Sequence, residues 1–176
     1  MSIEDKVESQ MEKNRSLTER IAMHIPIYKG YKQKNLRRDE DRAVRQEVAR
    51  ALENAKADLS TVQRASVGNL NLMRDAERVR AKADKYYIDV KKAAGGYSAF
   101  HDSIKILEAE LDGLISWDAQ LIDGATVLKD QTAAAVRDTD DENIDLKATL
   151  RGIEKTIDSL IEAYNERESV MRGFKE

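Results

Sequence analysis

The 176-residue chain contains no cysteine, one proline, eight glycines and few aromatic residues, namely six Tyr, two Phe and one Trp. The absence of cysteine excludes a disulfide framework, a thiolate nucleophile and any Cys-based zinc or iron–sulfur site. The low content of Pro, Gly and Phe is unusual for a compact sheet protein. It is typical of long amphipathic helices, as is the balance of 41% apolar to 36% charged residues.

Long apolar runs are also missing. No segment approaches the ~20 apolar residues that a membrane-spanning helix needs. The first stretch, MSIEDKVESQMEKNR, is charged from its fourth residue and does not resemble a secretory signal. We therefore expect a cytoplasmic protein, either free or peripheral at the inner face of the membrane. The length suits a single domain, residues 1–176, with a buried core.

The net charge of −3 hides a difference between the two halves of the chain. Residues 1–94 carry 21 Lys/Arg and 15 Asp/Glu, whereas residues 95–176 carry 9 and 18. Either the basic helices pack beside the acidic helices within one copy, or the two halves drive head-to-tail assembly of several copies. Both alternatives predict that charges of the first half pair with charges of the second.

Apolar residues recur every three or four positions almost throughout, and nowhere do four or more residues alternate as in a strand. We therefore predict an all-α fold, an elongated antiparallel helical bundle or long coiled-coil hairpin with four to five helices. The predicted helices cover residues 3–25, 33–65, 70–94, 98–136 and 141–172.

Local signals set several of these boundaries. Pro26 ends the first helix, because proline restricts the residue before it and cannot donate to the helix ladder. Asn69 can cap the third helix, and Asp140 or Asp141 can cap the fifth. The clearest apolar seams are Val44, Val48, Leu52, Ala55, Leu59 and Val62 in the second helix, and Leu146, Leu150, Ile153, Ile157, Leu160 and Tyr164 in the fifth.

No grouping of residues indicates a reaction. The chain lacks a phosphate-binding glycine loop, a dinucleotide fingerprint and a nucleophile elbow. Its two histidines, His24 and His101, have no Glu three residues earlier, unlike the ligands of di-iron bundles. We predict no catalytic residue, no cofactor and no metal site, and hence a protein that is not an enzyme.

Asp118 interrupts the apolar seam of the fourth helix between Leu114 and Leu121. A carboxylate buried there needs a partner, such as an Arg from the second or third helix or a tyrosine hydroxyl, and would act as a structural polar position on the seam. In the other interpretation the seam shifts to Ile115, Ala119 and Ile122, and Asp118 lies at its edge. The sequence leaves both open.

The stretch IPIYKGYKQKNLRR, residues 25–38, is named here the basic corner. It has five basic residues and no acidic one. It suits a corner between two helices, with Gly30 in the turn, or a surface for an anionic membrane, for the acidic half of another copy or for single-stranded nucleic acid. The pI of 5.6 makes nucleic acid the least favoured of these. The candidate binding residues are Tyr28, Lys29, Tyr31, Lys32, Lys34, Arg37 and Arg38.

Two stretches, IPIYKGYKQKNLRRDEDRAVRQEVA and GGYSAFHDSIKILEAELDGLISWDAQLIDG, resemble an uncharacterised family of prokaryotic helical proteins. That family carries an Ile-Pro-x-Tyr-Lys-Gly-Tyr segment before an Arg-rich helix, and a Gly-Tyr turn before a helix with an aromatic-Asp step. The resemblance covers residues 21 to about 128 and brings no known activity, substrate or catalytic residue. It implies that Tyr28, Gly30, Tyr31, Tyr97 and Asp118 belong to a shared structural plan.

In its general sequence character the chain also resembles the phage-shock and vesicle-inducing proteins, whose long helical hairpins polymerise on membranes. It departs from them in the first helix, where Gln10 and Asn14 interrupt the continuous apolar face that membrane insertion needs. The sequence thus predicts a helical scaffold or protein–protein interaction module that associates with itself or with another protein. The alternative is a peripheral membrane adaptor or membrane-remodelling protein that acts through residues 25–38.

Overall fold

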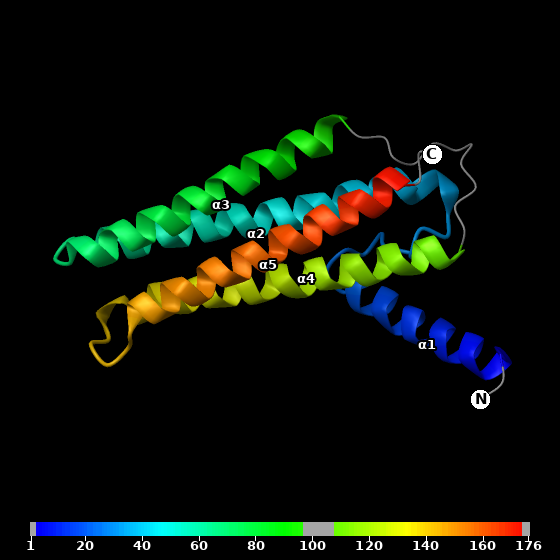
Figure 1. Ribbon diagram of the computed structural model, residues 1–176, viewed down its shortest axis with the longest axis horizontal. Helices are drawn as coiled ribbons and strands as arrows, with labels where there is room; N and C mark the ends of the chain where they lie inside the picture. The colour runs from blue at the N-terminus through cyan, green and yellow to red at the C-terminus, as the bar shows by residue number, and fades with distance from the viewer. Residues whose placement is uncertain (1–2, 97–107, 174–176) are drawn as a thin grey trace.

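The structure is a computed structural model that describes residues 3–96 and 108–173 of the chain (Figure 1). In these residues the protein is all-α, so the predicted fold class is confirmed. Two single-turn 3₁₀ helices are also present: η1 precedes α2, and η2 follows α4. The elements are α1 (Ile3–Ala22), η1 (Lys34–Leu36), α2 (Arg37–Ala65), α3 (Leu70–Gly96), α4 (Glu108–Arg137), η2 (Asp138–Asp140) and α5 (Leu146–Gly173).

The four long helices α2 to α5 form an elongated bundle of two antiparallel hairpins. Helix α2 pairs with α3, and α4 pairs with α5, while α2 packs on α4 and α3 on α5 across the two hairpins. Figure 1 shows that α2 and α4 run in one direction and that α3 and α5 run in the other. Helix α1 packs against α4 and projects away from the bundle.

The predicted seams of α2 and α5 lie in the core. Every residue of the α2 seam from Val44 to Val62 is buried, and so is the α5 seam from Leu150 to Tyr164, whereas Leu146 at its start is partly exposed. These stripes form because residues three and four apart share one face of a helix and bury it against neighbouring helices.

Helix α4 buries more of its circumference than a single seam. Leu114 and Leu121 are buried, and so are Ile115, Ala119 and Ile122, which the sequence analysis treated as an alternative stripe. Both stripes are covered because α4 packs against three helices, α1, α2 and α5. Asp118 lies between these stripes and is buried as well.

Several helix boundaries differ from the prediction by a few residues. Helix α1 ends at Ala22 instead of 25, because the chain tightens into a turn in which the His24 N–H donates to the carbonyl oxygen of Ile21, 3.0 Å away. Helix α2 begins at Arg37 after η1 instead of near residue 33, and α3 continues to Gly96 instead of ending near 94. The predicted beginning of the fourth helix at residue 98, and Tyr97, lie outside the described residues.

Helix α5 begins at Leu146 instead of 141, since the capping residue is Asp145. Its Oδ1 accepts the N–H of Ala148 at 3.1 Å, three residues on, as in an N-cap. Asp141 instead accepts the N–H of Asn143 at 2.9 Å and closes a turn before the helix. Asn69 caps α3 as predicted, with its Oδ1 3.1 Å from the N–H of Leu72.

Charges of the two halves of the chain pair across the bundle. Lys82 of α3 contacts Glu154 and Asp158 of α5, both at 2.9 Å, and Arg78 pairs with the same Glu154. Arg20 of α1 pairs with Asp123 of α4 at 3.1 Å. The structure therefore contains the pairing within one copy that the charge difference predicted. Among the described helices, none has the length and apolar content to cross a bilayer.

Candidate functional site

The basic corner connects α1 to α2 through two consecutive residues with left-handed backbone, Gly30 (φ 66°) and Tyr31 (φ 62°). A Cβ on Gly30 would lie 3.2 Å from Thr18 Oγ1 and 3.3 Å from Ile115 Cδ1, so both the tight space and the left-handed φ favour glycine here. Tyr31 is not a glycine and adopts this conformation at a cost of about 1–2 kcal/mol. Contacts elsewhere must therefore hold this corner in place.

Two side chains of the α2 N-terminal turn hold the corner backbone. Glu40 accepts the backbone N–H groups of Lys29 and Tyr31 on one oxygen, Oε1, the second at 3.3 Å. Arg37 donates from Nε to the carbonyl oxygen of Tyr31 at 2.7 Å. The start of α2 thus fixes the corner through the main chain.

Both tyrosines of the corner point into the bundle and meet Asp118. The hydroxyl of Tyr28 donates to Asp118 Oδ2 at 2.7 Å, and that of Tyr31 donates to the same oxygen at 2.5 Å. Their rings pack edge to face with centroids 5.4 Å apart. Arg167 of α5 donates from Nε to the other carboxylate oxygen, Oδ1, at 2.5 Å and from Nη2 to the Tyr31 hydroxyl at 3.0 Å. Asp118 therefore joins α4, α5 and the corner.

Further charged residues extend this network toward α2. Asp41 lies 2.8 Å from Arg167 Nη1 and 3.1 Å from Arg45 Nε. Arg45 Nη1 in turn lies 2.9 Å from Glu168 Oε1 and donates to the hydroxyl of Tyr164, also at 2.9 Å. We name this network the buried polar cluster; it comprises Tyr28, Tyr31, Asp41, Arg45, Asp118, Tyr164, Arg167 and Glu168.

Burial and the carboxylates set the ionisation of the cluster. Burial raises the pKa of Tyr28 and Tyr31 well above the ordinary value, and the charge of Asp118 adds to this, so both hydroxyls stay protonated donors. Burial lowers the pKa of Arg167, but Asp118, Tyr31 and Asp41 together outweigh burial, and the pKa of Arg167 is raised. The pKa of Arg45 is raised by Asp41 and Glu168 against the effect of burial. Both guanidinium groups are charged.

Glu40 differs from the cluster carboxylates because its second oxygen, Oε2, is buried without a hydrogen-bond partner. Burial raises the pKa of Glu40, while the two N–H groups on Oε1 lower it and the charge of Asp118 raises it further. Arg45 likewise has one buried nitrogen, Nη2, with no partner. Such atoms cost free energy and mark the places where the network is not complete.

The structure separates the seven predicted binding residues into three groups. Tyr28 and Tyr31 are buried, so the expectation that they offer aromatic surface to a partner is wrong, and their polar ends serve Asp118. Arg37 is half-buried on the corner backbone. Lys29, Lys32, Lys34 and Arg38 are exposed.

Of the two interpretations of Asp118, pairing on the seam is confirmed. The tyrosine hydroxyls are partners as predicted, but the arginine comes from α5 and not from the second or third helix. Arg167 and Asp41 were not among the residues predicted for the site. A signal was present, because Arg167 continues the α5 seam at the 3–4 spacing between Tyr164 and Met171, and Asp41 precedes Val44 on the α2 seam.

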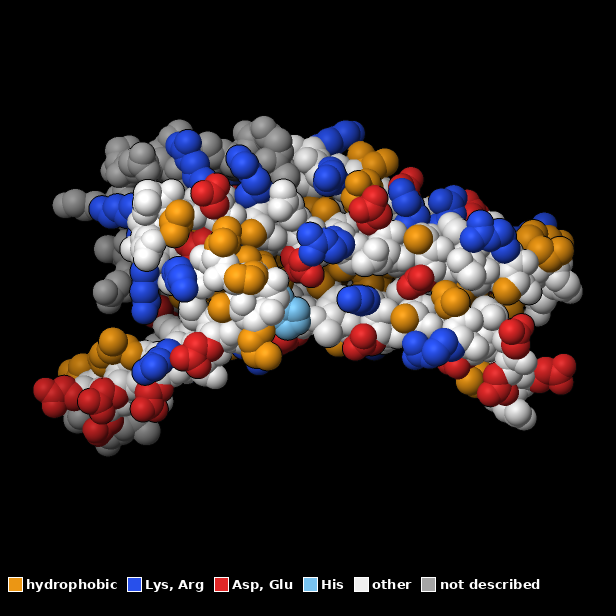
Figure 2. Space-filling view, turned by 180° about the vertical axis from the view of Figure 1, so that it is seen from behind, with side chains coloured by type: hydrophobic (Ala, Val, Ile, Leu, Met, Phe, Trp, Pro, Cys, Tyr) orange, Lys and Arg blue, Asp and Glu red, His pale blue; other side chains and the backbone are white. Residues whose placement is uncertain are grey.

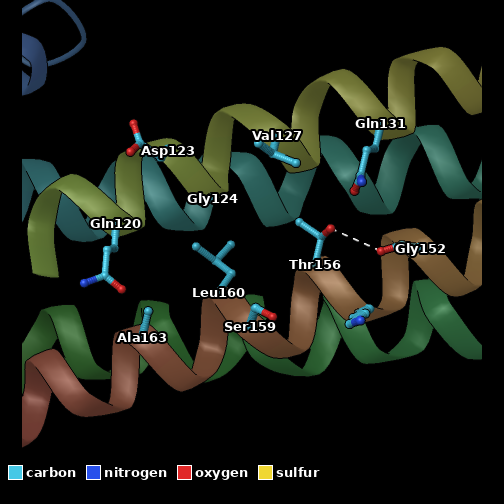
Figure 3. Close-up of a pocket in the computed structure, with 11 residues that line it drawn as sticks. Gln120, Asp123, Gly124, Val127, Gln131, Gly152, Thr156, Ser159, Leu160 and Ala163 are labelled. Carbon is cyan, nitrogen blue, oxygen red and sulfur yellow. Dashed lines mark hydrogen bonds between the residues drawn. The ribbon is translucent and has the colours of Figure 1, made fainter.

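Shallow grooves lie between helices on the described surface. One, of about 550 Å³, lies between α4 and α5 (Figure 3), and another, of about 700 Å³, lies between the C-terminal part of α3 and α5. Among residues 3–96 and 108–173, no three His, Asp or Glu side chains are placed to hold a metal ion. The cluster itself can fix the relative position of helices, but Tyr28, Tyr31, Asp118 and Arg167 offer no surface to a substrate.

The fold and the cluster define an all-α four-helix bundle with a helical arm, α1, fixed to it at the corner. Comparison of the chain with protein-family models, curated proteins and solved structures finds no match in any of the three. The resemblance to a family with an Ile-Pro-x-Tyr-Lys-Gly-Tyr segment therefore stays a prediction.

Proposed function

We propose that the protein is a non-enzymatic helical scaffold that associates with copies of itself through the outer half of α1. The observation that carries this proposal is an exposed apolar stripe on that half. Ile3, Val7 and Met11 follow each other at four-residue spacing and are 82%, 52% and 66% exposed. Figure 2 shows these hydrophobic side chains along one side of the projecting helix, with acidic side chains around its free end.

An apolar stripe on a helix is ordinarily buried against a partner, because most helical stability in proteins comes from tertiary packing. In α1 only Ile21, near the corner, is buried. The exposed stripe on the outer half is the type of surface that marks a protein–protein contact. The closed buried polar cluster supports the non-enzymatic part of the proposal, since its charged groups serve to fix helices.

Static light scattering across a range of protein concentrations tests self-association. We expect a mass above 19.9 kDa that rises with concentration for the unmodified chain. The double variant Val7→Ser with Met11→Ser is expected to have the mass of one copy. Val67→Ser, which changes an exposed valine in the turn between α2 and α3, is the matched control and should associate like the unmodified chain. A single-copy mass for the unmodified chain at every concentration would rule the proposal out.

A second candidate function is a peripheral membrane adaptor that binds an anionic lipid surface through the basic corner. The observation that favours it is the exposure of Met23 (83%) and Ile27 (46%) beside Lys29, Lys32 and Lys34. Among the described residues, the three lysines form no ion pair. Each Lys near an anionic surface contributes about 1 kcal/mol, and exposed apolar side chains add to this.

Co-sedimentation with anionic and neutral vesicles tests the membrane candidate. Binding should be confined to anionic vesicles and should be lost when Lys29, Lys32 and Lys34 are all changed to Glu. The same change of charge at Arg64, Arg74 and Lys85, which are exposed on α2 and α3, is the control and should leave vesicle binding intact. Absence of binding at low salt, where electrostatic attraction is strongest, would eliminate this candidate.

A further inference from the structure

The groove between α4 and α5 is an open channel with a largely apolar floor. Val127 of α4 and Leu160 and Ala163 of α5 line it, together with Gly124 and Gly152 (Figure 3). A Cβ on Gly152 would meet no atom within 4 Å, so the space above it is open. The groove runs along about 11 residues of each helix, or roughly 16 Å at 1.5 Å per residue.

A row of basic side chains on α5 enters this groove at one end, because the α5 lining begins at Gly152 and the row starts before it. Lys147, Arg151 and Lys155 are spaced by four residues and are exposed, and Lys155 lines the groove. In the part of the chain that the structure describes, none of the three forms an ion pair. These three cations are thus available to a partner with acidic groups at matching spacing.

The outer half of α1 has the complementary arrangement. One residue after each member of the stripe Ile3, Val7 and Met11 comes an acidic residue, so that Glu4, Glu8 and Glu12 form a row at four-residue spacing beside it. Within residues 3–96 and 108–173 these glutamates form no ion pair. The acidic row and the basic row of α5 both span eight residues, or about 12 Å along a helix.

The arm of one chain cannot enter its own groove. Helix α1 runs in the same direction as α4, since Asn14 donates to Asp112 and Arg20 pairs with Asp123. Residues 3–12 therefore extend past the beginning of α4 at Glu108, whereas the groove lies along Gln120 to Gln131, where only the end of α1 reaches it, through the pair of Arg20 with Asp123 (Figure 1). An arm that fills the groove must come from another copy.

We infer that the outer half of α1 from one copy lies in the α4–α5 groove of a second copy. Ile3, Val7 and Met11 cover the apolar floor, and the row Glu4, Glu8 and Glu12 faces the row Lys147, Arg151 and Lys155 of the second copy. This inference rests on the proposed self-association and names the surface that receives the arm. The contact is between two different surfaces, so copies join either as a reciprocal pair or as a chain of copies.

Charge reversal with cross-complementation tests the inference. Variant A carries Glu8→Lys and Glu12→Lys, and variant B carries Arg151→Glu and Lys155→Glu. Glu4 and Lys147 are left unchanged because they lie in the first turn of their helices, where a change of charge also alters helix stability. Each variant alone places like charges in the contact, and we expect its dissociation constant to rise roughly tenfold or more by light scattering.

Mixing A with B restores opposite charges in both possible contacts, because the basic arm of A meets the acidic groove of B and the acidic arm of B meets the basic groove of A. The equimolar mixture should therefore regain the mass of the unmodified chain. The matched control is Glu53→Lys on α2 with Asp89→Lys on α3, two exposed residues with the same charge change as A, which should not alter association. If A and B associate like the unmodified chain, the groove is not the receiving surface, although self-association stands. A single-copy mass for the unmodified chain overturns both.

Cross-linking gives a second measurement that does not depend on charge. The chain has no cysteine, so single cysteines can be placed freely. Val7→Cys on the arm and Ser159→Cys in the groove, mixed and oxidised, should form a disulfide between copies, whereas Val7→Cys with Val67→Cys should not. If Val7→Cys instead links mainly to itself, two arms pair with each other and the groove assignment is wrong.

Discussion

The buried polar cluster and the outer half of α1 distribute their side chains in opposite ways. In the cluster, Arg45, Arg167 and Asp118 lie in the interior with bonded partners. On the arm, Ile3 and Met11 lie in water without a partner in the same copy. The charged groups of the cluster pair with one another within one chain, whereas the apolar stripe of the arm has no such partner in the same chain. This difference indicates that the corner fixes the direction in which the arm projects, and it is the reason why the proposed association is assigned to the arm.

Replacing Asp118 breaks the cluster side of this comparison and has the largest expected effect. Asp118→Ala leaves the buried Arg167 without its closest counter-ion and two tyrosine hydroxyls without an acceptor. Loss of one partner of a buried pair costs about 3–5 kcal/mol in the free energy of unfolding. Urea denaturation measures this loss. Asp123→Ala, in the exposed pair with Arg20, is the control and should cost about 1 kcal/mol or less. Equal effects of the two changes would mean that the cluster does not stabilise the fold.

The backbone of the corner provides a second, smaller test. Gly30→Ala forces an alanine into left-handed backbone and places its Cβ against Thr18 and Ile115, so we expect a loss of about 1–3 kcal/mol. Gly113→Ala, in the interior of α4 where a Cβ meets no atom, should instead raise stability by about 0.5–1 kcal/mol. Both values come from the midpoints of thermal or urea unfolding. A Gly30→Ala variant as stable as the unmodified chain would show that the corner is loosely held.

The unpartnered oxygen of Glu40 predicts a dependence on pH. Burial raises the pKa of Glu40 above its ordinary value of 4.5, with the charge of Asp118 acting in the same direction and the N–H groups of Lys29 and Tyr31 opposing it. The folded protein thus holds this proton more tightly than the unfolded chain, and its contribution to stability is present below pH 4.5 and lost as the pH rises through the folded pKa. Glu40→Gln removes this titration.

We therefore expect the stability of Glu40→Gln, relative to the unmodified chain, to improve between pH 4 and pH 7. Glu53→Gln, the same change at an exposed position of α2, provides the baseline. Urea denaturation of the three proteins at both pH values measures the difference. A relative stability of Glu40→Gln that stays constant or falls over this range would mean that Glu40 keeps its charge in the folded state.

The bundle could be predicted from the sequence because its apolar seams repeat without interruption. The α2 seam from Val44 to Val62 and the α5 seam from Leu150 to Tyr164 each determine which face of the helix is buried, whatever the partner. The start of α5 was placed wrongly because several acidic residues in a row can each act as a cap. Only the fold shows that Asp145 does so and that Asp141 closes a turn.

The side-chain directions in the corner could not be predicted for a physical reason. Tyr28 to Arg37 form no long helix or strand, and two left-handed residues reverse the chain, so no period tells which side chains point inward. The arginine partner of Asp118 could not be predicted either. Arg167 lies 49 residues away, and the position of a charged residue on a seam does not show which helix it faces. Exposure of Ile3 and Met11 depends on the direction of the whole arm, which the corner sets.

Removing the apolar stripe of the arm tests the other side of the comparison and has the smallest expected effect on stability. In dilute solution, Val7→Ser with Met11→Ser should change the free energy of unfolding by no more than about 0.5 kcal/mol, because both side chains are exposed in the single copy. Ile21→Ala in the same helix, where the side chain is fully buried, should cost about 2–5 kcal/mol. Urea denaturation at low protein concentration measures both values. At high protein concentration the unmodified chain should become more stable than the double variant, because only the unmodified chain associates. A large loss for the double variant in dilute solution would mean that the stripe packs within one copy, and the arm would then no longer differ from the cluster.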